Sequence, residues 1–125
     1  MISRINTVHI FVFGSNRQGR HGKGAALHAR LHHGAVNGQA EGLQGSSYAI
    51  VTKELRRNCQ PVTLSEITLG VAKFLDFAAA HPNWDFNVTA IGCGLAGFAK
   101  DQIAPLFADR TSNVHLPNEW QEVDE

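Results

Sequence analysis

The chain has 125 residues, of which 43% are hydrophobic and 18% charged. This composition is typical of one globular domain and excludes a disordered or fibrous protein. Lysine plus arginine and aspartate plus glutamate both number 11, so the formal charge is zero and a protein that coats nucleic acid is not expected. The N-terminal apolar stretch is too short for a signal peptide or a membrane span. We therefore expect a cytoplasmic protein with no membrane association.

The first half of the chain predicts two strands, one helix and one long loop. Residues 8–13 (VHIFVF) form an almost continuous β-branched and aromatic run, typical of a central strand buried on both faces. Small and apolar residues over 25–33 predict a helix that ends at a glycine. Residues 34–47 contain four glycines and little to bury, which predicts a long, polar, adaptable loop of the kind that is often functional. Residues 48–52 (YAIVT) predict the second strand.

The second half predicts two helices and two strands. The sequence Thr63-Leu64-Ser65-Glu66 is a capping box, and apolar residues then recur at helical spacing as far as position 78. A third strand is expected over 86–91, a helix over 101–108 and a short last strand over 114–116. We expect one α/β domain over residues 1–117, followed by an acidic tail over 118–125.

Strands that alternate with helices predict a three-layer domain with a mostly parallel central sheet. In such a sheet all strand-to-helix loops lie along one edge, so the glycine-rich turns Gly14 to Gly24 and Gly92 to Gly97 should meet there. Helix N-termini at this edge carry unpaired amides, which favour an anionic ligand. Arg20 and Lys23 in the first turn add positive charge.

The first turn, GSNRQGRHGKGAA, completes no standard nucleotide-binding motif. A P-loop would close with GK[ST], and the spacing after Gly22 does not complete the dinucleotide fingerprint GxGxxG. What remains is backbone chemistry, because glycines allow amides to approach a phosphate closely. A flexible turn that binds nothing is the alternative.

Three side chains near these turns are candidates for chemistry. His21 could act as an acid, a base or a phosphate donor near neutral pH. Lys53 directly follows the second strand, so its amine could reach the edge or could be a solvated charge. Asn16 could orient a ribose or a water, or could merely support the turn.

Neither metal binding nor cysteine chemistry is expected. His28 and His32 are four residues apart on one helical face, but no third ligand accompanies them, which favours solvated histidines and no metal. Cys59 and Cys93 lack the spacing of a disulfide framework or a zinc site. Cys93 follows a strand, where a thiolate could form, but no arginine closes its loop, which favours a small buried thiol.

Taken together, the two turns resemble those of the macro domain, the ADP-ribose-binding fold. VFGSN resembles that family's strand ending in asparagine, and GRHGKGAALH resembles its glycine-rich stretch before a helix. IGCGLAGF, residues 91–98, resembles the phosphate-binding loop of compact macro proteins, which include ADP-ribose-1''-phosphate phosphatases and terminal ADP-ribose hydrolases. The resemblance covers residues 8–116 and extends to small phage and prophage proteins with FGSN, GLQG and IGCGLAGF segments.

The resemblance implies roles for individual residues. Asn16 would face the distal ribose, Phe98 could stack beside the ribose or base, and Lys53 matches the nucleophile of lysine-dependent hydrolases. In those hydrolases an aspartate follows the GCGL segment, and here that position is Ala96. The ligand-binding residues implied are Gly14, Ser15, Asn16, Gly22, Lys23, Gly24, Gly92, Cys93, Gly94, Leu95, Ala96, Gly97 and Phe98.

Two functions follow as hypotheses. One is a hydrolase, most simply a phosphatase, that acts on an ADP-ribose-like nucleotide with Asn16, His21 and Lys53 as catalytic residues and with no cofactor. The other is a module that binds such a nucleotide without turnover, which the alanine at position 96, in place of the hydrolases' aspartate, would favour. A third possibility is a protein that uses the loop 34–47 to contact a partner.

Overall fold

A computed structural model describes residues 7–93 and 97–120. Its elements are β1 (Val8–Asn16), α1 (Gly24–His32), β2 (Gly42–Gln44), β3 (Ser47–Lys53), α2 (Leu64–Ala79), β4 (Trp84–Val88), α3 (Lys100–Ile103), the 3-10 helix η2 (Ala104–Phe107), β5 (Val114–His115) and the 3-10 helix η3 (Asn118–Trp120). Five strands of the described residues form one sheet in the order β2-β3-β1-β4-β5. No helix in the described part of the chain is long and apolar enough to cross a membrane.

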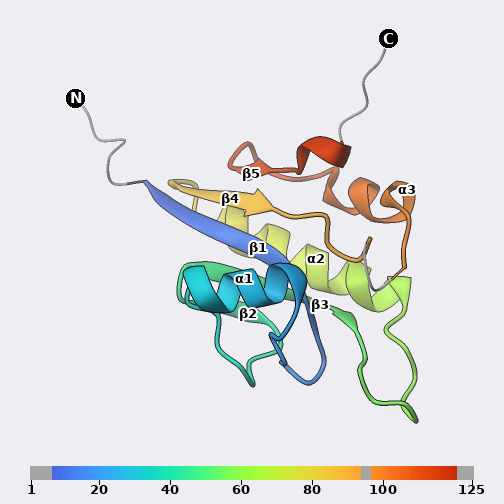
Figure 1. Cartoon of the computed structure of the whole chain (residues 1–125). Helices are drawn as coiled ribbons and strands as arrows, with labels where there is room; N and C mark the ends of the chain where they lie inside the picture. Colours follow the sequence, from blue (N-terminus) through green and yellow to red (C-terminus); the bar gives the residue numbers. More distant parts are fainter. Residues whose placement is uncertain (1–6, 94–96, 121–125) are drawn as a thin grey trace, which may run out of the picture.

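The sheet is mostly parallel and lies between helices, which confirms the predicted α/β class. β1 pairs in parallel with both β3 and β4, and β4 pairs in parallel with β5. Helix α1 covers one face of the sheet, whereas α2 lies on the other face (Figure 1). The carboxyl ends of β1, β3 and β4 therefore lie at one edge, where α1 begins.

Helix α2 forms as the capping box predicts. The Thr63 hydroxyl accepts a hydrogen bond from the Glu66 amide at 3.2 Å, and the Glu66 carboxylate accepts one from the Thr63 amide at 2.9 Å. The residues of α2 that are buried against the sheet are Ile67, Val71, Phe74 and Ala78.

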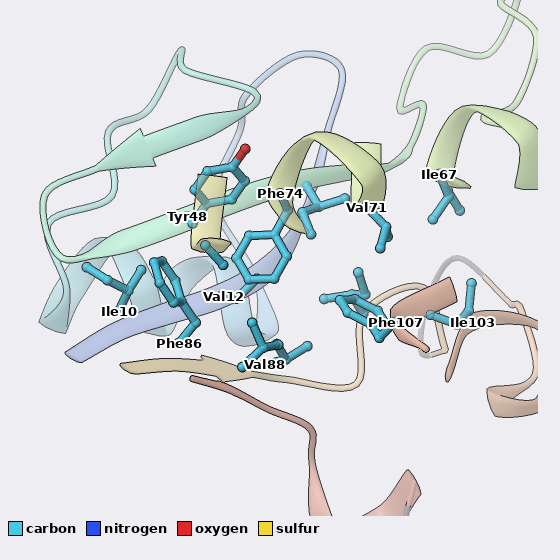
Figure 2. Close-up of a cluster of buried hydrophobic side chains, with 14 of the residues drawn as sticks. Ile10, Val12, Tyr48, Ile67, Val71, Phe74, Phe86, Val88, Ile103 and Phe107 are labelled. Carbon is cyan, nitrogen blue, oxygen red and sulfur yellow. The ribbon is translucent and has the colours of Figure 1, made fainter. Parts of the chain in front are cut away.

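The larger core lies between α2 and the sheet (Figure 2). Phe74 is fully buried at its centre, with its ring centroid 5.0 Å from that of Tyr48 and 5.5 Å from that of Phe86. Phe107 packs on Phe74 from η2, and Trp120 packs on Phe107 at 5.7 Å. Trp120, which lies within the predicted acidic tail, is buried, whereas Asn118 and Glu119 before it are exposed.

The smaller core lies between α1 and the opposite face of the sheet. Phe13 of β1 contributes its only large buried side chain, and the other buried members are alanines of α1, β3 and the segment after α1: Ala26, Ala29, Ala35 and Ala49. Small side chains let the helix approach the sheet closely. The N-terminus of α1 is thereby fixed beside the ends of β1 and β3.

The segment 34–47 is not the adaptable loop that its composition predicts. It contains β2, which pairs antiparallel with β3 and makes the sheet mixed. Its ends touch, because a Cβ added to Gly45 would lie 2.6 Å from the Gly34 Cα, and both glycines have positive φ angles. The strand was not predicted because Gly-Leu-Gln carries no β-branched residue and only three residues pair.

The bounds of β1 and β4 also differ from the predicted ones. β1 continues past Phe13 to Asn16, because residues beyond Gly14 still pair with β3 across a register irregularity. β4 begins at Trp84 and ends at Val88, and the chain then turns tightly, with the Ile91 amide bonded to the Thr89 carbonyl at 2.7 Å.

Replacing Phe74 with alanine is expected to lower the free energy of unfolding by about 3–5 kcal/mol, because a fully buried phenyl ring leaves a cavity. Chemical denaturation measures the change. The matched control in the same helix is Leu69→Ala, at a side chain that is 68% exposed, where we expect a change of less than about 0.5 kcal/mol. Equal losses in the two variants would contradict this account of the core.

Candidate functional site

A cavity of about 910 Å³ lies at the carboxyl ends of the central strands and the start of α1, within the size range of small-molecule sites. Three stretches supply most of its lining: the β1–α1 turn with α1, the end of β3 with Leu55, and the residues after β4. Part of the segment 34–47 also lines it. The lining residues are Gly14, Ser15, Asn16, Gly19, Arg20, His21, Gly22, Lys23, Gly24, Ala25, Ala26, Arg30, Asn37, Gly38, Thr52, Lys53, Leu55, Thr89, Ala90, Ile91 and Gly92.

The N-terminus of α1 opens into this cavity. Lys23 is the N-cap residue, and its side chain makes no capping hydrogen bond, nor does the first turn contain an acidic residue. A Cβ placed on Gly22 or Gly24 would meet no described atom within 4 Å, so the backbone is open at both positions. The first amides of the helix and the positive end of its dipole thus face a space that can hold an anion.

The cavity wall carries cations that are not neutralised. Arg20, Lys23 and Lys53 line it, and none of the three has an ion-pair partner among the described residues. Arg30 also lines it and donates from Nε to the His21 carbonyl at 3.1 Å. No described lining residue is acidic. The local charge is positive although the chain as a whole is neutral.

Two neighbouring arginines are, in contrast, neutralised by carboxylates. The Glu54 side chain is 1% exposed and accepts from Arg17 Nη1 and from Arg56 Nε, each at 3.1 Å. Arg17 also pairs with Glu66 at 2.7 Å, which ties the β1–α1 turn to the N-terminus of α2. The hydrogen bonds from Arg56 are the main cause that lowers the pKa of Glu54 to about 2.

Asn16 lines the cavity, but both ends of its side chain bond to the turn. Nδ2 donates to the Arg20 carbonyl at 2.8 Å, and Oδ1 accepts from the Arg20 amide at 2.9 Å. The side chain is buried. These contacts support the role of holding the turn in place, which was one of the two predicted roles for Asn16.

His21 is buried at 1% exposure, and its ring packs edge-on against Phe13. Nε2 lies 3.1 Å from Gln44 Oε1 and 3.2 Å from the Gln39 carbonyl. Both are acceptors, because Gln44 Oε1 also accepts from the Val36 amide at 2.8 Å. Nε2 therefore donates to protein acceptors that hold the ring in place, whereas Nδ1 has no hydrogen-bond partner among the described residues. The predicted acid or base role of His21 stays a prediction.

The second glycine turn contributes less of the cavity wall than expected, within the part of it that is described. Gly92 lines the cavity with φ +74°, whereas Cys93 and Phe98 are not among the lining residues. Phe98 packs against the larger core. Cys93 is half-buried rather than buried as predicted, and desolvation raises the pKa of its thiol. Gly97 is exposed. The predicted ligand-binding residues Gly94, Leu95 and Ala96 lie outside the described residues.

Sequence reasoning did not select several lining residues. Thr52 lies one residue before the end of β3, and its hydroxyl donates to the Ser15 carbonyl at 3.2 Å. Thr89 directly follows β4, and its hydroxyl donates to the Val12 carbonyl at 2.8 Å. Asn37 and Gly38 come from the segment 34–47, in which an Asn-Gly pair among glycines was the available signal. Arg20 was noted for its charge but not chosen as a site residue.

The two helix histidines considered as metal ligands do lie together. The ring centroids of His28 and His32 are 4.7 Å apart, and His33 lies 5.1 Å from His28. Burial, followed by the charges of the other two rings, lowers the pKa of His33. Across residues 7–93 and 97–120, no group of three His, Cys, Asp or Glu side chains could hold a metal ion.

The fold is similar to three solved structures. Two are proteins from Bacteroides thetaiotaomicron. The first, described as being of unknown function, has a TM-score of 0.61 and 15% identity over 89% of this chain and 87% of that one. The second has a TM-score of 0.61 and 16% identity over 89% of each chain. The third is a macrodomain protein from Streptomyces coelicolor, with TM-score 0.54 and 18% identity over 92% of this chain and 90% of that one. No protein-family model and no curated protein matches the sequence.

These likenesses show the fold: a single α/β domain with a five-stranded mixed sheet flanked by helices, similar to that of a macrodomain. The predicted relation to phosphatases, hydrolases and phage proteins stays a prediction.

The Glu54 network should make stability depend on pH. The folded-state pKa of Glu54 is about 2 against an ordinary value of 4.5, so its contribution is complete above pH 4.5 and is lost as the pH falls through 2. We expect the free energy of unfolding to fall between pH 5 and pH 2, and to fall less in Glu54→Gln. Urea denaturation across this range measures it, and an identical pH dependence in the two proteins would contradict the assignment.

Proposed function

We propose that the cavity binds ADP-ribose or a related nucleotide diphosphate. The observation that carries the proposal is the convergence on one cavity of an open helix N-terminus and three cations that have no ion-pair partner within residues 7–93 and 97–120. Backbone amides and basic side chains recognise phosphate oxygens, and neither needs a metal ion to do so. The similarity of the fold to that of a macrodomain supports this class of ligand.

The cavity offers different chemistry to the two parts of such a ligand. The diphosphate fits the start of α1, where Gly22 and Gly24 leave room and Arg20 and Lys23 supply charge. Apolar side chains that line the rest of the cavity, among them Ala25, Ala26, Leu55, Ala90 and Ile91, can cover a ribose or base.

Binding without turnover is the function that the geometry supports best. In two of the predicted catalytic residues, protein groups engage both polar atoms of the Asn16 side chain and the Nε2 atom of His21. Hydrolysis is the second candidate, and one observation favours it: Lys53 lines the cavity with no ion-pair partner among the described residues, so its amine is available to a ligand.

Gly22→Ala tests the diphosphate position. Its φ is not in the left-handed region and the added methyl group would meet no described atom, so the variant should keep the wild-type melting temperature. A phosphate that contacts this backbone would be displaced, and we expect ADP-ribose affinity to fall about tenfold or more by calorimetry. Gly70→Ala, in α2 outside the cavity, is the control for glycine replacement. Unchanged affinity in Gly22→Ala would contradict the proposed position.

Turnover is tested with two substrates. With ADP-ribose-1''-phosphate the readout is phosphate release, and with an ADP-ribosylated protein it is loss of the ADP-ribose label. We expect binding but no product above the uncatalysed rate. If product forms and Lys53→Met abolishes it while Arg57→Gln, at an exposed site outside the cavity lining, does not, the hydrolase is the correct function. Failure of ADP-ribose, ADP and NAD to bind would reject both candidates.

A further inference from the structure

The segment 36–40 contributes to the cavity wall, although none of the residue roles implied by the resemblance to macro proteins falls on it. Asn37 and Gly38 line the cavity from this segment. The Gly38 amide donates to the Gly19 carbonyl at 2.8 Å, which joins the wall to the β1–α1 turn. Close contact is required here, because a Cβ on Gly19 would lie 2.7 Å from the Gly38 carbonyl carbon.

Asn37 presents a hydrogen-bond donor whose orientation is fixed. Its Oδ1 accepts from the His21 amide at 2.9 Å, so the other end of the side chain is the NH2 group. This nitrogen has no hydrogen-bond partner among the described residues, and the residue is exposed on the cavity wall. An exposed donor beside uncompensated cations is suited to an oxygen of an anionic ligand.

A buried pair of side chains holds this wall in place. Gln44 is 3% exposed, and its Oε1 accepts from both the His21 ring and the Val36 amide, while its Nε2 donates to the Gln39 carbonyl at 3.2 Å. Val36 and Gln39 flank Asn37 on either side. His21 and Gln44 are therefore positioning residues, and they fix the backbone that carries the Asn37 amide.

We propose that Asn37 binds the ligand directly, its Nδ2 donating to a phosphate or ribose oxygen opposite the N-terminus of α1. The inference rests on the proposed function, since it names a further contact of the same ligand. It gives the segment 36–40 a part in ligand selection, because a residue at position 37 that carries an acceptor in place of the NH2 donor could not make this contact.

The test measures ADP-ribose affinity by calorimetry for the wild type, Asn37→Asp and Asn37→Ala. Aspartate keeps an oxygen for the His21 amide, so the wall stays in place, but it replaces the donor with a negative charge. We expect affinity to fall about tenfold or more in Asn37→Asp and several-fold in Asn37→Ala. Asn83→Asp makes the same change of charge in an exposed turn before β4, at the opposite end of the sheet, and should bind as the wild type does.

Two further readouts separate contact from long-range charge. Raising the salt from about 50 to about 500 mM screens distant charges. If Asn37→Asp has lost a direct contact, its ADP-ribose affinity should therefore stay below that of the wild type at high salt. In the wild type, the side-chain NH2 resonances of Asn37 should shift when ADP-ribose is added. Wild-type affinity in both variants with unmoved resonances would overturn the inference and leave the proposed function intact. No binding by the wild type would overturn both.

Discussion

Parallel pairing of β1 with both β3 and β4 is the constraint on which the site depends. It brings three strand ends to the same edge, so residues as far apart as Asn16, Lys53 and Gly92 line one cavity. Close packing of α1 on the sheet through alanines then sets where the helix begins. The larger core lies on the other face of the sheet and meets the cavity at Ile91, a buried core residue that also lines the cavity.

Charge is sorted within a short stretch of sequence. The arginines and lysines between residues 17 and 23 and between 53 and 56 fall into two groups. Arg17 and Arg56 surround the buried Glu54 carboxylate, whereas Arg20, Lys23 and Lys53 face the cavity without carboxylate partners among the described residues. The buried Glu54 carboxylate thus neutralises two arginines, and the remaining cations give the cavity wall a positive charge. A neutral chain can in this way attract an anionic ligand locally.

Much of the fold could be predicted from the sequence, because its signals are local. The run at 8–13 and the capping box at Thr63 each follow from neighbouring residues, and β1 and α2 are where these patterns indicate. The short strand β2 was missed because it exists only through its pairing with β3. The strand order predicted that the glycine-rich turns meet at one edge, where the cavity lies, but it did not predict the side-chain contacts there: the His21 ring bonds to Gln44, 23 residues away.

The contact between Gly34 and Gly45 gives the intervening segment a closed shape. Its two ends meet at backbone distance, and the Ser46 amide bonds to the His33 carbonyl at 2.8 Å just outside the closure. Segments whose ends already touch tolerate changes of length and content at small entropic cost, because the rest of the chain does not have to move. This stretch carries a cavity wall, and besides its closed neck it is tied to the fold by the pairing of β2 with β3 and by the hydrogen bond from the Gly38 amide to the Gly19 carbonyl. Changes of length are therefore expected between Gly34 and the start of β2, where the segment carries the cavity wall, and not in β2 itself, which is part of the sheet.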